Sequence, residues 1–418
     1  MIPAVRGTRD ILPGEVERWQ FVEATARAIF ERYGYAELRT PIIEREELFA
    51  KGTGETTDIV QKEMYAFTDK GGERVTLRPE ATPSIVRAFA EHSLEQAMAV
   101  PKLYLFGPMF RYERPQKGRY RQFHQLDVEV FGVEDASIDA EILDLAWTLV
   151  QELGIADAEM VVNSVGCPAC RPAFAQALVA ALGEDAARLC EDCQRRAATN
   201  PLRIFDCKVE TCQEAIANAP KVTDFICPEC QGHFNQVKKY LEMVELPYIL
   251  NPRMVRGLDY YTRTAFEVVS YQLGSQNAVT GGGRYDNLFQ EIGDLDVPGI
   301  GFAIGMERLV SLLPKDKEFF QCPHLFVAAL GEETIKEAYR IINQLHLQGI
   351  RVELDYEGKS LKSQMRRADK LKAEYVLILG EDEMKRGKAA LRNMGSKVQE
   401  EIALKDIVNT LKEKILRD

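Results

Sequence analysis

The 418-residue sequence lacks any run of about 18 apolar residues, the length that a helix needs to span a bilayer. It also lacks a charged segment followed by an apolar one ahead of Arg6, so no secretory leader is visible. Internal repeats and low-complexity tracts are missing as well. These absences predict a cytoplasmic protein with no membrane partner, and they argue against a repeat array.

Basic residues are in the minority, with 53 Lys and Arg against 64 Asp and Glu, which gives a net charge of -11. This balance argues against indiscriminate coating of DNA, but it permits a local basic surface that meets RNA. Hydrophobic residues make up 46% of the chain and charged residues 28%, as in an ordinary globular protein. The length predicts two to three domains.

The most informative stretch spans residues 110–132, where two alternating segments flank a basic loop and predict an antiparallel hairpin. One face of the second arm carries Phe123, Gln125, Asp127 and Glu129. An unpaired buried polar group costs about 1–3 kcal/mol, so a polar ligand would explain this face. The loop carries Arg111, Arg114, Lys117, Arg119 and Arg121, which suit phosphate or nucleic acid. The alternative is an exposed amphipathic hairpin with a solvated loop.

Three other segments carry candidate site residues. Glu80 and Thr82 stand between a short strand beginning at Arg74 and a helix expected over residues 84–92, where they could instead be helix caps. Three glycines at 281–283 allow a ligand or a neighbouring strand to approach the backbone closely. Arg308 follows a strand of small residues that leaves room for a flat ring, although tight strand-helix packing is the alternative.

Periodicity predicts the remaining elements. We expect helices over residues 15–32, 137–153 and 231–244, and strands over 36–43, 159–163 and 248–250. Pro41 cannot donate to a ladder, so the strand that contains it belongs at a sheet edge or a bulge, where a partner subunit could pair. After a charged linker at 315–321, alternating strands (324–330, 351–355, 375–379) and helices (332–347, 361–372, 407–416) predict a compact α/β domain.

Four motifs occur along the chain in this order: the hairpin, Arg-Gly-Leu-Asp-Tyr-Tyr at 256–261, Gly-Gly-Gly-Arg-Tyr-Asp at 281–286 and Gly-Met-Glu-Arg at 305–308. With them the chain resembles bacterial histidyl-tRNA synthetase, a class II aminoacyl-tRNA synthetase, over nearly its whole length. Pro41, residues 110–132 and residues 299–309 match the three class motifs. Residues 256–261 and 281–286 match the family's own histidine signatures.

The resemblance implies an α+β class II catalytic core on an antiparallel sheet, a small cysteine-rich insertion and a C-terminal α/β anticodon-binding domain. These divide the chain into residues 1–165 (core), 166–246 (insertion), 247–318 (core) and 323–418 (anticodon binding). The implied enzyme activates L-histidine with ATP, releases pyrophosphate and transfers histidine to the 3′ end of tRNA(His). A homodimer is implied, as is Mg2+ on the phosphates by analogy with other phosphoryl chemistry.

The resemblance also implies residue roles. Glu80, Gln125 and Glu129, with Thr82 beside them, would hold the histidine α-amino group, and an ammonium does need acceptors. Tyr260, Tyr261 and Tyr285 would surround the imidazole. The two catalytic residues would be Arg111 and Arg256, which would hold the ATP α-phosphate from opposite sides, Arg111 gripping the histidine carboxylate too. Glu113 and Arg119 would meet the adenine and the far phosphates, and Arg308 would stack on the adenine or contact the terminal phosphate.

Two departures from the family pattern stand out. Ala81 occupies a position where many relatives have glycine, and Asp127 one where they usually have a small or apolar residue. The second functional hypothesis is a non-catalytic paralogue that regulates ATP phosphoribosyltransferase in histidine biosynthesis. Such paralogues usually lose the arginine that Arg256 matches and the C-terminal domain, and this chain has both. A plain RNA-binding module, the third hypothesis, would not need the polar face of the hairpin.

Eight of the nine cysteines lie between residues 167 and 230. Two pairs have the two-residue spacing of a zinc knuckle, so we predict structural zinc on Cys167, Cys170, Cys190 and Cys193. Cys207, Cys212, Cys227 and Cys230 follow, with His233 close behind, so one or two tetrahedral sites are chemically reasonable. Buried or free thiols are the alternative. The insertion also carries arginines that could contact the tRNA acceptor arm.

Overall fold

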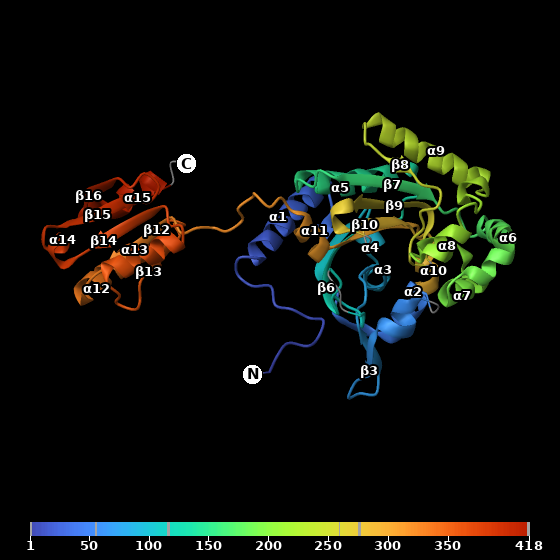
Figure 1. The fold of residues 1–418 in the computed structure, drawn as a ribbon, viewed down its shortest axis with the longest axis horizontal. Coiled ribbons are helices and arrows are strands. Elements are labelled where there is room, and N and C mark those ends of the chain that lie inside the picture. The colour runs from blue at the N-terminus through green and yellow to red at the C-terminus, as the bar shows by residue number, and fades with distance from the viewer. Residues whose placement is uncertain (1, 55–56, 115–117, 259, 275–276, 416–418) are drawn as a thin grey trace. The chain divides into compact units, whose positions relative to one another are not determined.

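The computed structural model describes residues 2–54, 57–114, 118–258, 260–274 and 277–415. Lys117 and Asp259, which belong to the motifs above, fall outside these ranges. The chain forms two compact units, Met1–Glu318 and Phe319–Asp418, coloured blue to orange and orange to red in Figure 1. Among the described residues, no helix combines the length and the apolar character that a bilayer crossing requires.

The first unit is built on an eight-stranded sheet. Its strands follow the order β1 (Ala36–Glu37), β5 (Lys102–Phe110), β6 (Gln122–Phe131), β11 (Gly299–Gly305), β10 (Ala278–Arg284), β9 (Thr262–Ser270), β7 (Ala158–Ser164) and β8 (Ile249–Leu250). The pairs from β5 to β7 are antiparallel, while β1 and β8 join the edges in parallel. The predicted hairpin is therefore confirmed as β5 and β6, the second and third strands of this sheet.

Helices flank this sheet: α1 (Val16–Arg32), α2 (Glu46–Thr53), α3 (Thr82–Glu91), α4 (Leu94–Ala97), α5 (Ala136–Glu152), α10 (Leu288–Gly293) and α11 (Met306–Leu312). Helix α1 buries Trp19, Val22, Ala26, Ile29 and Phe30, the face that the periodicity predicts. Helix α5 begins after Asp135, whose carboxylate accepts a hydrogen bond of 2.8 Å from the Ser137 amide. Local sequence thus fixes the start and the buried side of these helices.

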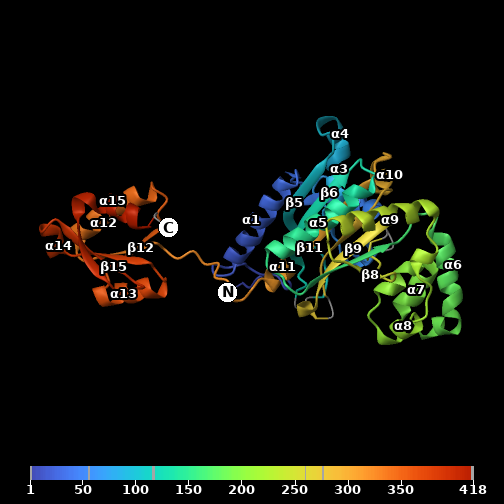
Figure 2. The ribbon, with the colours of Figure 1, turned by 90° about the horizontal axis from the view of Figure 1, so that it is seen from above.

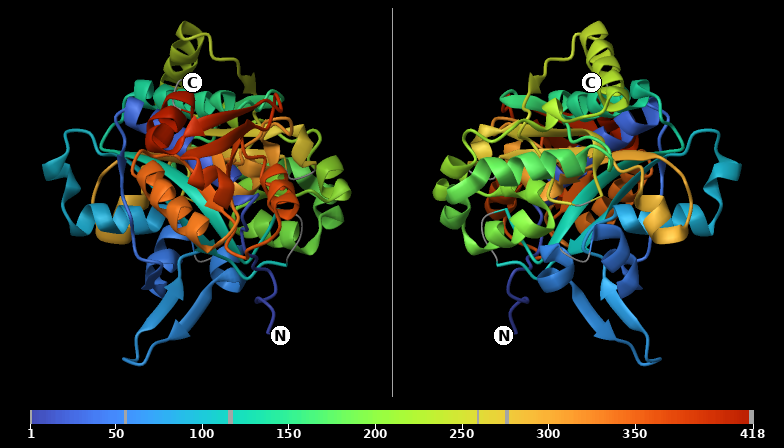
Figure 3. Two further views of the ribbon diagram at one scale, coloured as in Figure 1. Left: turned by 90° about the vertical axis from the view of Figure 1, so that its left-hand side faces the viewer. Right: turned by 90° about the vertical axis from the view of Figure 1, so that its right-hand side faces the viewer.

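The predicted strand over residues 36–43 is wrong as a single element. The chain leaves the eight-stranded sheet after β1 and enters a second, three-stranded sheet at β2 (Ile43–Arg45), beside β4 (Arg74–Leu77) and β3 (Tyr65–Thr68). Pro41 lies in the break, because it has no N–H to offer either ladder. The β3–β4 hairpin projects from the body of the unit (Figure 3), and a short π-helical segment, Ile59–Glu63, precedes it.

The cysteine-rich segment is helical and gathers at one end of the first unit (Figure 2). It contains α6 (Arg171–Leu182), α7 (Glu191–Thr199), α8 (Glu210–Ala215) and α9 (Pro228–Met243), with short 3-10 turns at Gly183–Arg188, Pro201–Asp206 and Val222–Asp224. Its buried Leu178 and Phe205 belong to the same hydrophobic cluster as Val255 and Tyr261 of the following loop. The insertion therefore packs continuously with the wall of the site described below.

The second unit is a five-stranded sheet in the order β13 (Val352–Leu354), β12 (Leu325–Ala329), β14 (Tyr375–Leu379), β15 (Lys388–Asn393) and β16 (Gln399–Ala403). Its helices are α12 (Glu332–His346), α13 (Leu361–Lys370), α14 (Glu381–Lys385) and α15 (Ile407–Ile415). The predicted α/β alternation is confirmed, but the sequence did not indicate β15 and β16. Those strands are antiparallel and carry Lys388, Arg392 and Glu400 among their residues, so no apolar run marks them.

Candidate active site

A cavity of about 310 Å³ lies over the centre of the eight-stranded sheet, between β6, β10, β11, the loop at 256–261 and the start of α11. It is lined by all twelve residues that the sequence assigned to histidine or ATP: Glu80, Thr82, Arg111, Glu113, Arg119, Gln125, Glu129, Arg256, Tyr260, Tyr261, Tyr285 and Arg308. These residues come from seven separate stretches of chain. The structure brings every one of them to the same place.

Two buried carboxylates define one end of the cavity. Thr82 donates a hydrogen bond of 2.6 Å from Oγ1 to one Glu129 oxygen, and the Tyr285 hydroxyl donates to the other. The Tyr260 hydroxyl lies 3.2 Å from a Glu80 oxygen, while Thr53 donates to the second oxygen. Strand β6 and the turn before α3 therefore present acceptor oxygens that neutral hydroxyls hold in place.

Burial changes the acid-base behaviour of this end. Loss of solvent raises the pKa of Glu129 to about 8, although the Thr82 and Tyr285 hydroxyls oppose the shift. Burial likewise raises the pKa of Glu80, and both burial and the charge of Glu129 raise the pKa of Asp127 well above its ordinary value. A cationic ligand here would relieve the repulsion among the three carboxyl groups.

Several polar atoms lining the cavity are buried without a hydrogen-bond partner among the described residues. They are Gln125 Oε1, Asp127 Oδ2 and Arg256 Nε. Each such atom costs about 1–3 kcal/mol if it stays unpaired, which indicates that a polar ligand completes the site. Asp127, the unusual residue of the hairpin, shares the face of Gln125 and Glu129 and is 1% exposed. Its place in the cavity follows from the two-residue period of β6.

Three tyrosine rings form a wall beside the carboxylates. The ring centroids of Tyr260 and Tyr261 lie 4.8 Å apart, and those of Tyr260 and Tyr285 lie 5.6 Å apart. All three side chains are buried. Glycines make room for this wall, since a Cβ at Gly299 would overlap the Tyr285 ring and one at Gly301 would overlap the Glu129 carboxylate. The small residues of β11 thus fit side chains of the site itself.

Guanidinium groups also line the cavity. Arg111 donates a 2.8 Å hydrogen bond to the Pro79 carbonyl, and its guanidinium lies 5.3 Å from the centre of the Phe123 ring. Arg256 forms an ion pair with Glu267 of β9. Burial acts to lower the pKa of Arg256, but the combined effect of Glu267, Tyr261 and Asp206 outweighs it and raises that pKa above its usual range. Arg256 therefore carries a permanent charge at this wall.

A third group of lining residues consists of Glu113, Arg119 and Arg308. Glu113 and Arg119 are 3.2 Å apart, and Arg308 donates a 2.9 Å hydrogen bond to the Ala278 carbonyl. Burial and the nearby Arg119 charge lower the pKa of Arg308, so an anion between these two arginines would be favoured. Glu307, which sequence reasoning missed, accepts bonds of 3.0 and 3.1 Å from the His124 amide and so fixes α11 against β6.

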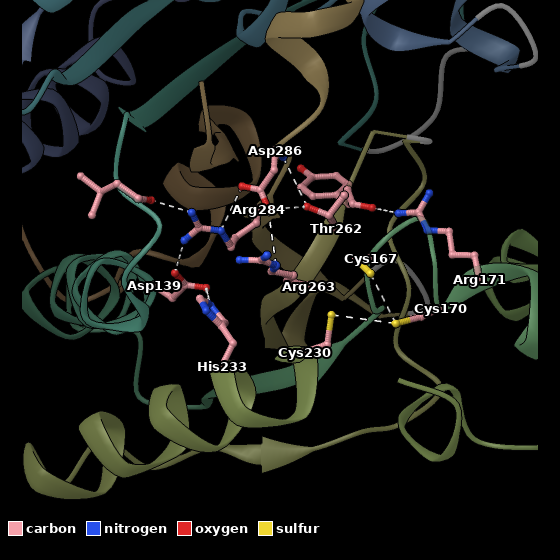
Figure 4. Close-up of polar contacts among 12 residues, drawn as sticks. Asp139, Cys167, Cys170, Arg171, Cys230, His233, Thr262, Arg263, Arg284 and Asp286 are labelled. Carbon is pink, nitrogen blue, oxygen red and sulfur yellow. Dashed lines mark hydrogen bonds and ion pairs between the residues drawn. The ribbon is translucent and has the colours of Figure 1, made fainter. Parts of the chain in front are cut away.

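Behind the cavity, Arg284 is a second residue that sequence reasoning missed. It is 0% exposed and contacts Asp139 Oδ2 at 2.5 Å, the Val133 carbonyl at 2.6 Å and Asp286 at 3.1 Å (Figure 4). Asp139 also meets His233 of α9 at 3.0 Å, so His233 is engaged here. Arg284 directly precedes Tyr285 in the chain. The sequence feature that could have identified Arg284 is its position between three glycines and a Tyr-Asp pair.

Gly281 offers a test of the packing behind Arg256. A Cβ at this position would overlap the Arg256 guanidinium, so Gly281→Ala should displace that group while leaving the chemistry of every side chain intact. Displacing a positioning group by about 1 Å can cost on the order of 100-fold in rate, and we expect a loss of this size in ATP–pyrophosphate exchange. Gly232→Ala on α9, where a Cβ meets nothing within 4 Å, is the matched control and should exchange normally.

The predicted four-cysteine site is wrong in its membership. Cys167 and Cys170 cluster with Cys227 and Cys230, whereas Cys190 and Cys193 cluster with Cys207 and Cys212. Helix α6 and the turn after it separate the two Cys-x-x-Cys pairs, and folding brings each pair to a different later segment. Spacing identified the knuckles but could not reveal which distant segment completes each one.

Comparison with known proteins places these features in a family. Residues 7–309 match the family model described as histidyl-tRNA synthetase, and residues 324–414 match that of the anticodon binding domain. The chain is 54% identical over 404 residues to a histidine-tRNA ligase of Geobacter metallireducens, covering 97% of this chain and 98% of that one. It is 52% identical over 413 residues to the enzyme of the same name from Syntrophotalea carbinolica, covering 99% of each.

Solved structures of the histidyl-tRNA synthetase family resemble this chain as well. The apo histidyl-tRNA synthetase of S. aureus matches with a TM-score of 0.83 at 36% identity, covering 99% of this chain and 100% of that one. An ATP phosphoribosyltransferase regulatory subunit/histidyl-tRNA synthetase from Bacillus halodurans matches at 0.67 and 20% identity, covering 91% and 98%, so it shares the fold alone. The resemblance seen in the sequence is confirmed: the chain belongs to the histidyl-tRNA synthetase family of aminoacyl-tRNA synthetases.

Proposed function

We propose that this protein is a histidine-tRNA ligase, which forms histidyl-adenylate from L-histidine and ATP and then transfers histidine to the 3′ end of tRNA(His). The observation that supports it best is the set of side chains that line one cavity. Buried carboxylates and an amide, several guanidinium groups and three tyrosine rings all line it. Tyr260 and Tyr285 contact the carboxylates of Glu80 and Glu129, and the Arg256 guanidinium lies 5.9 Å from the centre of the Tyr261 ring. A zwitterionic amino acid beside a nucleotide triphosphate matches that distribution of charge.

In this proposal, Glu80, Gln125 and Glu129 accept hydrogen bonds from the histidine ammonium, with Thr82 holding Glu129 in place. The Tyr260, Tyr261 and Tyr285 wall encloses the imidazole. A site that hydrogen-bonds a polar substrate group rejects analogues that lack the group, because its own buried partners stay unpaired. The histidine side chain is thereby distinguished from apolar side chains of similar size.

Activation needs one displacement at phosphorus. The histidine carboxylate attacks the α-phosphorus of ATP, a new oxygen–phosphorus bond forms and pyrophosphate leaves. Arg111 and Arg256 would hold the α-phosphate from opposite sides, where fixed charge stabilises the transition state without any covalent enzyme intermediate. Glu113, Arg119 and Arg308 would hold the adenine and outer phosphates. Mg2+ would neutralise charge on those outer phosphates.

The non-catalytic regulator is the second candidate, and it shares the fold. The chain has Arg256 in the cavity wall and a second compact unit, and the regulator hypothesis requires neither. The discriminating experiment is histidine-dependent exchange of labelled pyrophosphate into ATP by the purified protein. We expect exchange with histidine and none with other amino acids. Absence of exchange under conditions where the protein is folded would favour the regulator.

The second unit supplies the anticodon-binding part of the proposal. Deleting residues 323–418 should reduce charging of tRNA(His) by about tenfold or more. The deletion removes the proposed contacts with the tRNA anticodon, which we expect to be worth at least about 1.4 kcal/mol. Exchange of pyrophosphate, which needs no tRNA, should change far less, since the first unit has its own core. Equal losses in both assays would contradict this division of labour.

The remaining assignments complete the proposal. We propose a cytoplasmic homodimer, with the boundaries at residues 165, 246 and 318 as functional divisions of the chain and structural zinc in the insertion. Exposed Ile42 and Ile43 follow Pro41 at the break between β1 and β2, and apolar side chains at such an edge suit a partner subunit. Sedimentation velocity should show a species of twice the chain mass, and a monomer at micromolar concentration would overturn the dimer.

A further inference from the structure

The eight cysteines of the insertion fall into two separate groups of four, which we define as cluster 1 (Cys167, Cys170, Cys227, Cys230) and cluster 2 (Cys190, Cys193, Cys207, Cys212). Within each cluster the four sulfur atoms all lie within 4.8 Å of one another. We propose that each cluster binds one zinc ion, so that the chain holds two independent tetrathiolate sites. This inference rests on the cysteine geometry and not on the catalytic proposal.

Distances between sulfur atoms support metal sites and exclude disulfides in this conformation. The Sγ atoms of Cys167 and Cys170 are 3.5 Å apart, those of Cys170 and Cys230 are 3.9 Å apart, and those of Cys190 and Cys207 are 3.9 Å apart. A tetrahedral zinc with Zn–S bonds of about 2.3 Å places its sulfurs roughly 3.8 Å apart. A disulfide would need about 2.05 Å.

Backbone amides are directed at these sulfurs. The Cys227 amide donates to Cys170 Sγ at 3.1 Å, and the Cys190 amide donates to Cys212 Sγ at 3.2 Å. The Val209 amide approaches Cys207 Sγ at 3.4 Å. Amide donors stabilise negative charge on sulfur, which is the state that a metal requires, and such outer contacts orient the ligands. Both clusters have these donors.

Each cluster joins segments that regular secondary structure does not join. In cluster 1, Cys170 and Cys227 are 57 residues apart, so one ion would fasten the entrance of the insertion to its exit at the start of α9. Cluster 2 would connect the start of α7 with α8 and the 3-10 turn at Pro201–Asp206. The helices here are short, and metal ions commonly supply the folding free energy that such segments cannot.

Cluster 1 also lies beside the segment that carries Tyr261, and Figure 4 shows Cys167, Cys170 and Arg171 near Thr262 and Arg263 of that segment. Arg171, next to Cys170, donates a hydrogen bond to the Tyr261 carbonyl oxygen. Gly166, next to Cys167, accepts a 2.9 Å hydrogen bond from the Arg263 amide. Gly166 has a φ of +67°, and a Cβ there would lie 2.8 Å from Cys170 Cβ, so glycine is needed for this approach. Zinc at cluster 1 would thus hold the segment that carries Tyr261.

Metal content of the purified full-length protein tests the proposal. Mass spectrometric metal analysis should find two zinc ions per chain. A Cys170→Ser/Cys230→Ser variant and a Cys193→Ser/Cys212→Ser variant should each keep one. Cys322→Ser, which changes the one cysteine outside both clusters, should keep two. A single ion that both double variants abolish, no ion at all, or iron in place of zinc would overturn the inference.

X-ray absorption on the unmodified protein gives a result that does not depend on how the variants fold. The extended fine structure beyond the zinc absorption edge should fit four sulfur neighbours at about 2.3 Å and no nitrogen or oxygen. A shell containing nitrogen would mean that a histidine replaces a cysteine and would contradict the ligand sets.

One consequence of cluster 1 does depend on the proposed ligase function. The Cys170→Ser/Cys230→Ser variant should raise the KM for histidine more than the KM for ATP. The Cys193→Ser/Cys212→Ser variant of cluster 2 should change both KM values by a similar factor. If the protein has no exchange activity, this readout disappears, but the zinc count still decides the metal proposal.

Discussion

Replacing Arg256 with alanine should lower histidine-dependent pyrophosphate exchange by about 100-fold to 1000-fold, the usual cost of removing one fixed charge-stabilising donor. Arg256 lines the same cavity as Arg111, and its ion pair with Glu267 keeps it charged and oriented. Arg256→Lys should recover only part of the rate, since an ammonium keeps the charge but loses the planar fork. Steady-state exchange at saturating ATP and histidine gives the comparison.

The control for this prediction is a neighbouring arginine. Arg253 is exposed in the same loop and donates to the Ala217 carbonyl, so Arg253→Ala removes an arginine without entering the cavity. We expect near-normal exchange from it. If Arg256→Ala has the same melting temperature and the same rate of pyrophosphate exchange as the unmodified protein, Arg256 has no role in the mechanism.

Histidine binding should release a proton near neutral pH. Glu129 has a pKa of about 8 in the free protein, so it is mostly protonated at pH 7 and must ionise to pair with an ammonium. Affinity for histidine should therefore rise about tenfold per pH unit as the pH approaches 8 and level off above it. Calorimetry in buffers of different ionisation enthalpy counts the released proton directly.

The Glu129→Gln variant isolates this group from Glu80 and Asp127, whose pKa values are also raised. It should weaken histidine binding by about 10-fold to 100-fold, since a hydrogen bond to a charged group is worth roughly 1.5–3 kcal/mol. The variant should also lose the part of the pH dependence that Glu129 causes, while the KM for ATP stays similar. An unchanged pH profile would assign the titration to another carboxyl group.

The sequence predicted the site far better than it predicted the connections around it. The two-residue period of β6 placed Gln125, Asp127 and Glu129 on one face, and the structure puts that face in the cavity. Short-range patterns work here because a strand fixes the direction of every second side chain. The roles of the twelve residues rest on the family resemblance and on chemistry, and they remain predictions.

What the sequence could not give depends on long-range pairing. Cys170 meets Cys230 through the folding of the whole insertion, and no spacing rule contains that information. Arg284 was missed because its partners, Asp139 and Val133, lie on a distant helix and the loop before it. Strands β15 and β16 were missed because they lack the apolar run that marks the parallel strands β12 and β14.

The proposed mechanism depends on guanidinium groups holding a nucleotide while buried oxygens hold one amino acid beside it. A crystal structure with L-histidine bound tests this most directly. It should show the ammonium within hydrogen-bond distance of Glu80, Gln125 or Glu129 and the imidazole against the tyrosine wall. Histidine bound outside this cavity, or bound with its carboxylate toward Glu129, would contradict the proposed mechanism.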